Sequence, residues 1–148
     1  MKMIRPIQLI TILSMFTAIL WSCGGSGTKH EGEHTADDNT WAEMDSYHMI
    51  MAESYHPLKD SANLAPAREN AEALAVEAEK WASAKLPDRV NNDEMTTRLQ
   101  NLKSSSRAFA DKVKSGATDE ELSSALTALH DEFHHIMEAW AGGHGEHH

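Results

Sequence analysis

The segment from residue 119 to residue 141 carries the pattern that most restricts how this chain can fold. Its large apolar side chains recur every three or four residues, which is the spacing of one face of an α-helix. At 3.6 residues per turn they fall within about 40° of a common direction. They are Leu122, Leu126, Leu129, Phe133, Ile136 and Trp140. A helix with one apolar face needs a partner surface, so the rest of the chain must supply one.

Capping residues and prolines divide the preceding sequence into further helices. Thr40 with Glu43 forms a capping box that predicts a helix from Trp41 to about Tyr55, where His56-Pro57 ends or kinks it. An alanine-rich helix is expected over residues 67–86, which follow Pro66 and end just before a second proline, Pro87.

A third helix is expected after Asn91 or Asn92, either of which can cap it, and Gly116 closes it. Its apolar positions are Met95, Leu99, Leu102, Phe109 and Val113. A second capping box, Thr118 with Glu121, then starts the last helix. Four helices with short connections predict an all-α fold, an antiparallel up-down-up-down four-helix bundle over residues 40–141.

The N-terminus has the organisation of a secretory signal. Lys2 and Arg5 precede an apolar stretch, and "LWSC" at its end resembles the lipobox of bacterial lipoproteins. The resemblance implies a signal peptide over residues 1–22 and lipid attachment at Cys23, the only cysteine in the chain. The expected location is the cell envelope, with the protein lipid-anchored to the outer membrane on its periplasmic side or at the cell surface.

The two ends of the mature chain are polar and rich in histidine. Residues 23–39 are expected to form a lipidated flexible tether, and residues 142–148 a disordered tail. The formal charge of −10 becomes −12 once Lys2 and Arg5 leave with the signal. This acidity disfavours nucleic acid as a partner and suits cations, metal ions among them.

Soft, metal-binding side chains interrupt the last helix. His130, His134 and Met137 lie together on one flank of its apolar stripe, roughly 60° to 120° from the stripe's centre. His135 points to the far side and is expected to be solvated. The question is which residues the rest of the chain places opposite the flank.

The first helix carries a histidine inside its own apolar stripe. That stripe is Trp41, Met44, Tyr47, His48, Met51, Tyr55 and Leu58. An unpaired buried imidazole costs desolvation free energy, so His48 is expected to have a partner. His56, next to Pro57, is expected on the surface or in a loop, and Asp45 and Asp131 are at best outer partners of a site.

In an up-down bundle the first and last helices are antiparallel neighbours. Placing residue 41 opposite residue 140 sets three pairs level: Met44 with Met137, His48 with His134, and Met51 with His130. Imidazole with thioether suits copper or haem iron, and imidazole with carboxylate suits zinc. The alternative is structural, because methionines on helical stripes usually fill cores and a half-buried histidine usually bonds to a carboxylate.

The stretch "TALHDEFH", residues 127–134, resembles the terminal haem-binding helix of the periplasmic b-type four-helix-bundle cytochromes and the related cytochromes c-prime. The resemblance implies haem between the first and last helices, with His130 as axial ligand and Met44 as the counterpart of the family's helix-one methionine. The chain has no C-x-x-C-H, so covalent c-type haem is excluded. On the register above, His48 and His134 are level, whereas Met44 is about one turn too far from His130 to match the family's ligand pair.

No catalytic motif is present in the sequence. It has no nucleophile with an orienting base, no phosphate-binding glycine loop and no H-E-x-x-H. We therefore expect a non-enzymatic protein that binds copper or zinc between the first and last helices, for sequestration or for delivery to a protein partner. The alternatives are a b-type haem electron-transfer protein with a redox partner, and a structural or interaction lipoprotein without a cofactor.

Overall fold

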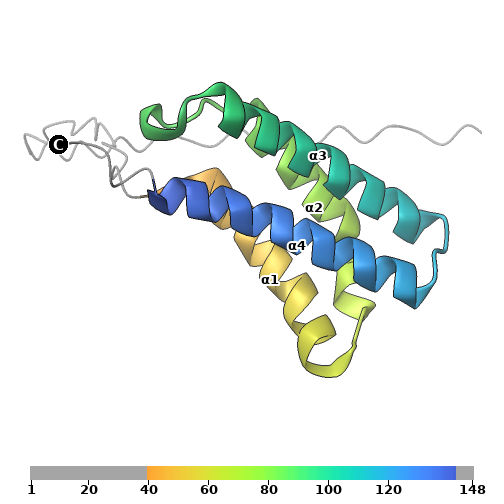
Figure 1. The fold of residues 1–148 in the computed structure, drawn as a ribbon. Coiled ribbons are helices and arrows are strands. Elements are labelled where there is room, and N and C mark those ends of the chain that lie inside the picture. Colours follow the sequence, from red (N-terminus) through yellow and green to blue (C-terminus); the bar gives the residue numbers. More distant parts are fainter. Residues whose placement is uncertain (1–39, 143–148) are drawn as a thin grey trace, which may run out of the picture. The chain divides into compact units, whose positions relative to one another are not determined.

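The computed structural model describes residues 40–142, which form four α-helices and one short 3-10 helix (Figure 1). The helices are α1 (Ala42–Ser61), α2 (Ala65–Ser83), η1 (Asp88–Val90), α3 (Asp93–Lys114) and α4 (Asp119–Gly142). Residues 40–142 contain no strand, so the all-helical prediction is confirmed for this part of the chain. The expected signal peptide, lipidated tether and most of the histidine-rich tail lie outside the described residues.

The predicted caps of the last two helices are present. At the start of α4, the Thr118 N–H donates to Glu121 Oε2 at 2.9 Å, and the Glu121 N–H donates to Thr118 Oγ1 at 3.3 Å. The hydrogen bonds from Thr118 hold the pKa of Glu121 below its ordinary value. At the start of α3, Asn92 Oδ1 accepts from the Met95 N–H at 2.8 Å. Each cap satisfies N–H groups that have no partner within the helix.

Both predicted ends of α1 need correction. Trp41, rather than Thr40, is the N-cap, and its side chain makes no capping hydrogen bond. The helix also continues through Pro57 to Ser61, because a proline removes one N–H donor but leaves its carbonyl able to accept. Ala62 then adopts the left-handed conformation, and the Asn63 N–H donates to Pro57 O at 3.0 Å, which closes the helix.

Polar contacts between exposed side chains run along α2 and α3. Arg107 pairs with Glu72 at 2.9 Å, and Lys103 pairs with Glu79 at 3.5 Å. Further along, the side-chain amide of Gln100 donates to the Ala82 carbonyl at 3.3 Å. Partners later in α2 are therefore earlier in α3, as antiparallel neighbours require. The connection between these helices contains η1, which the sequence analysis did not anticipate.

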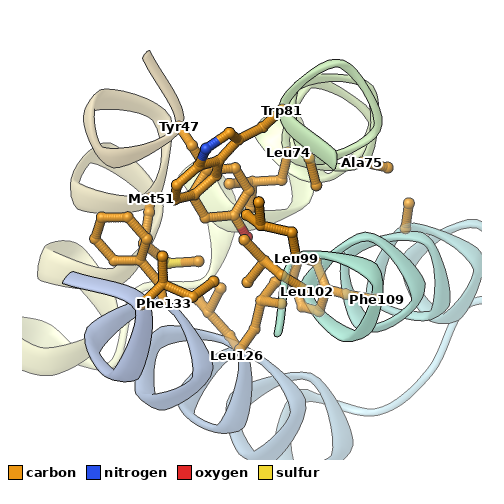
Figure 2. Close-up of a cluster of buried hydrophobic side chains, with 14 of the residues drawn as sticks. Tyr47, Met51, Leu74, Ala75, Trp81, Leu99, Leu102, Phe109, Leu126 and Phe133 are labelled. Atoms are coloured by element: carbon orange, nitrogen blue, oxygen red, sulfur yellow. The ribbon is translucent and has the colours of Figure 1, made fainter. Parts of the chain in front are cut away.

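The core is built from side chains of all four helices, and Figure 2 shows them meeting in one interior cluster. All six residues of the predicted α4 stripe are buried. From α1, Tyr47 reaches across to α3, where its hydroxyl lies 3.0 Å from that of Ser106. Burial raises the pKa of Tyr47, so this phenol stays neutral. Among residues 40–142, no helix combines the length and the apolar character needed to cross a membrane.

Candidate metal centre

The line of contact between α1 and α4, here called the seam, has the predicted pair of residues at its first end. The rings of Trp41 and Trp140 meet with their centroids 5.1 Å apart, so residue 41 does face residue 140. Further along the seam, the His48 ring stacks on Phe133 with a centroid separation of 5.4 Å. Because position 41 meets 140 and position 48 meets 133, the two helices run in opposite directions along this seam.

At the other end of the seam the predicted side-chain pairing differs from the observed one by one helical turn of α1. Tyr55, rather than Met51, meets His130, and their rings stack 3.7 Å apart with an angle of 14° between their planes. Side chains of a helix lean toward its N-terminus, so the long Tyr55 ring covers the level of the preceding turn. Met51 points into the core instead, with 1% of its surface exposed.

His130 and His134 form a close pair of potential metal ligands at this contact between α1 and α4. Their Nε2 atoms lie 3.0 Å apart, one helical turn from each other on α4. An ion 2.0–2.1 Å from both nitrogens would join them at an angle of roughly 94°. The two rings therefore already have the separation of two ligands on one ion.

The surroundings of His130 favour its neutral form. Burial, first, and the neighbouring His134 lower the pKa of His130, while Asp131 acts in the opposite direction. The Asp131 Oδ1 atom lies 3.6 Å from His130 Nδ1, too far for a hydrogen bond but close enough for attraction. Nδ1 is buried and has no hydrogen-bond partner among the described residues. A proton on Nδ1 faces the carboxylate and leaves the Nε2 lone pair directed at His134.

His48 does not occupy the buried position that its place in the α1 stripe predicted. Its side chain is exposed, and one face of its ring covers Phe133. Position 48 lies on the edge of the stripe next to α4, so its ring reaches the rim of the seam. Within residues 40–142, no three histidine, cysteine or acidic side chains are arranged to hold a metal, so His48 does not complete a three-ligand site with the histidine pair.

The three methionines of the predicted cluster pack with the apolar side chains of the core. Met51 is in the core, and Met44 and Met137 are half-buried and pack against it. Their burial agrees with the structural alternative, in which methionines on helical stripes fill the interior. The described geometry brings His130 and His134 together.

The opposite flank of α4 faces α3. His135 is exposed, as predicted, and lines a pocket of about 320 Å³ together with Glu132. The other lining residues come from α3: Arg98, Asn101, Ser104 and Ser105. Ser105 Oγ donates to Glu132 Oε1 at 2.8 Å. The sequence analysis missed this pair, although the run of three serines inside an amphipathic helix was a signal for a polar contact.

His56 is the other functional candidate that the sequence analysis set aside. Because α1 continues through Pro57, His56 is a helical residue immediately after Tyr55, whose ring covers His130. Its side chain is exposed, and its charge is one of the influences that lower the pKa of His130. His56 was set aside because Pro57, which follows it, was interpreted as the point where the helix ends or kinks.

Comparisons with known proteins do not assign the chain to a family. No protein-family model, curated protein or solved structure matches the chain. The resemblance to four-helix-bundle cytochromes therefore stays a hypothesis, and a functional assignment depends on the arrangement of the residues themselves.

Proposed function

We propose that this chain is a non-enzymatic, lipid-anchored protein of the cell envelope that binds a transition-metal ion, copper or zinc, between α1 and α4. The proposed scaffold is an antiparallel up-down-up-down bundle, and the proposed ligands are His130 and His134. The observation that carries the proposal is the 3.0 Å separation of their two Nε2 atoms. The net negative charge of the chain favours the approach of a cation.

The rival explanation of the close pair is a hydrogen bond between neutral imidazoles. Such a bond needs a proton on one Nε2 and contributes little on an exposed surface, where water competes for both nitrogens. Two features favour a metal ligand instead. Tyr55 holds the ring of His130 by stacking, and Asp131 lies beside the Nδ1 atom of His130, as carboxylates do behind metal-bound histidines.

The geometry of the pair bears on the choice of metal. The angle of roughly 94° is close to the 90° of a tetragonal Cu(II) site, whereas tetrahedral Zn(II) requires a wider angle. A separation of about 3.3 Å would reach that angle, and a small rotation of the exposed His134 ring supplies it. The separation of the two nitrogens is therefore closer to that of ligands in a Cu(II) site than in a tetrahedral Zn(II) site.

The b-type haem alternative has weaker support. The side chains at the α1–α4 contact, among them Trp41, Met51 and Phe133, are packed into the core. A haem between these helices would have to displace aromatic rings that lie 5 to 6 Å from one another. An absorption spectrum of the purified protein separates the alternatives, because a Soret band would support haem, and a protein that binds metal but has no Soret band would support the present proposal.

Metal titration of the mature chain tests the proposed ligands directly. His130→Ala and His134→Ala should each weaken binding of Cu(II) or Zn(II) at least tenfold, about 1.4 kcal/mol. The double variant should lose little more, because the ligands of one site act together. His135→Ala is the matched control, since it removes a neighbouring imidazole on the opposite flank, and its affinity should equal that of the wild type.

One result would remove the proposal. If the double variant kept full affinity and deletion of the "HGEHH" tail abolished binding, the tail would be the metal site and the histidine pair would be packing. If neither change affected binding and no haem were found, the structural lipoprotein would remain as the explanation.

The membrane anchor has its own test. Cys23→Ser should release the protein from the membrane fraction, because no helix of residues 40–142 can span a bilayer and an acyl chain contributes about 0.8 kcal/mol per buried methylene. Fractionation with the membrane in this variant would reject the lipoprotein assignment.

A further inference from the structure

The histidine pair on α4 supplies half of the ligands that a transition-metal ion usually takes. The Nε2 atoms of His130 and His134 lie 3.0 Å apart, and tetrahedral Zn(II) and square-planar Cu(II) sites have four ligands. In the described part of the chain, no third histidine, cysteine or acidic side chain is arranged with the pair to hold one ion. An ion held by the pair would therefore keep two positions open to further donors.

These open positions would lie at the surface of the molecule. His134 is exposed, and 21% of the His130 side chain remains exposed although Tyr55 stacks on its ring. The Nδ1 atom of His130 is buried, whereas its Nε2 atom faces the exposed His134 ring. A donor from another molecule can therefore approach an ion at this pair from the solvent side of His134.

The flank of α4 that carries the pair has no charged side chain between residues 123 and 141. At 100° per residue, six positions of this stretch fall within a strip about 80° wide. This uncharged strip consists of Ser123, Thr127, His130, His134, Met137 and Ala141. The acidic residues of the same stretch, Asp131, Glu132 and Glu138, lie outside it. In a chain with 23 acidic and 13 basic residues, two copies can approach along this strip without setting carboxylates directly against each other.

We propose that a second copy of this chain supplies the remaining ligands, so that one Cu(II) or Zn(II) ion is held by the histidine pairs of two chains. This inference rests on the proposed function and deepens it, because it names the partner of the same site. The two pairs are identical, so a two-fold axis through the ion relates them, and the uncharged strip of each chain faces that of the other. Two chains with the same net negative charge repel each other, so the metal-free chain is monomeric and the ion controls assembly.

Sedimentation of the mature chain at increasing ratios of metal to chain tests this assembly. With a chelator present, the mass should be that of one chain, and with half an equivalent of Zn(II) it should approach twice that value. With several equivalents of Zn(II), each pair binds an ion of its own, so the mass should return to that of one chain. A single-chain mass at every ratio would overturn the inference.

Variants connect the change in mass to the histidine pair. His134→Ala removes an exposed imidazole, so it should keep the helical content of the metal-free chain, while half an equivalent of Zn(II) should no longer double the mass. His135→Ala removes the adjacent exposed imidazole on the opposite flank and is the matched control, which should dimerise as the wild type does. Deletion of residues 143–148 should also leave the dimer intact. Loss of the dimer in either of these two controls would overturn the inference.

Electron paramagnetic resonance with half an equivalent of Cu(II) counts the nitrogens on the ion and separates the inference from the function beneath it. Four imidazole nitrogens in a species of double mass are expected. Four nitrogens in a species of single mass would show that one chain completes its own site, and two nitrogens in a species of single mass would show that water does. Either result, with binding that still requires His130 and His134, would overturn the dimer and leave the two-histidine site standing. Binding that needs neither His130 nor His134 would remove both proposals together.

Discussion

The two flanks of α4 carry the same kinds of residue and use them in different ways. On the flank toward α3, Glu132 accepts a hydrogen bond from Ser105, which fixes the carboxylate in the structure. On the flank toward α1, rings stack: Tyr55 covers His130, whose Nε2 atom faces that of His134. The adjacent residues His134 and His135 lie on opposite flanks, so one step along the sequence separates the two environments.

The difference lies in what each kind of contact leaves available. A hydrogen bond occupies the polar atoms that make it, so the Ser105–Glu132 pair contributes to packing one helix against another. Stacking occupies the face of an imidazole ring and leaves the nitrogen lone pairs in its plane unused. The contact on the α3 flank therefore contributes to stability, whereas on the α1 flank the Nε2 atoms of His130 and His134 face each other and are the ligands that we propose for a metal ion.

The largest effect is expected from the stripe that lies between the two flanks. Leu126 is fully buried at its centre, so Leu126→Ala should lower the free energy of unfolding by about 2–5 kcal/mol. Chemical denaturation followed by circular dichroism measures this. Ser124→Ala, an exposed change on the same helix, should stay within about 0.5 kcal/mol of the wild type. Equal effects of the two changes would contradict the described core.

The next effect belongs to the α3 flank alone. Ser105→Ala leaves Glu132 Oε1 without its donor, while Oε2 is already buried and has no hydrogen-bond partner within residues 40–142. The expected loss of stability is about 1–3 kcal/mol, with unchanged metal affinity. Ser104→Ala, at the neighbouring exposed serine, is the control and should have little effect on either quantity. Reduced metal affinity in Ser105→Ala would show that the two flanks are coupled.

The sequence predicted most of what depends on helical period and capping. The buried stripe of α4 is identical to the one predicted, and Asn92 and Thr118 cap the helices assigned to them. These features are local, because a hydrogen bond three residues away or an apolar face every three to four residues does not depend on distant contacts. That is why they can be derived from spacing alone.

The site was predicted less well because it depends on the contact between two helices. The flank holding His130 and His134 was identified, but Met51 was expected where Tyr55 lies, and His48 was expected to be buried. Which side chain of α1 contacts a given residue of α4 depends on the length of the side chain and on its lean toward the helix N-terminus. A helical wheel shows only the direction of a side chain around the axis, so it includes neither factor. Because Pro57 was expected to end or kink α1, the last turn of the helix was not predicted, and His56 was assigned to the surface or a loop.

A smaller effect is expected from the ring that covers the histidine pair. Tyr55→Leu keeps an apolar side chain but removes the stack on His130, which should cost about 0.5–1.5 kcal/mol of stability. Metal affinity should fall severalfold, because the ligand ring is no longer held in place. Isothermal titration measures the affinity, and Met49→Leu, at an exposed position of α1, is the control. Unchanged affinity would mean that His134 or the metal itself orients His130.

The smallest effect is expected from protonation of the metal-free α1 flank. Burial and His134 lower the pKa of His130 in the folded chain, whereas in the unfolded chain it should be near the ordinary value of about 6.5. As the pH falls through 6.5, the unfolded chain takes up this proton and the folded chain does not, so stability decreases until the pH reaches the folded pKa. Above pH 6.5 the contribution of neutral His130 is fully present. With a chelator added, His130→Gln should therefore lose less of its melting temperature between pH 7.5 and pH 5.5 than the wild type does. His135→Gln, on the exposed α3 flank, should keep the wild-type dependence. If the two variants showed the same pH dependence, His130 and His135 would contribute alike to the pH dependence of stability, and the two flanks would not differ in this respect.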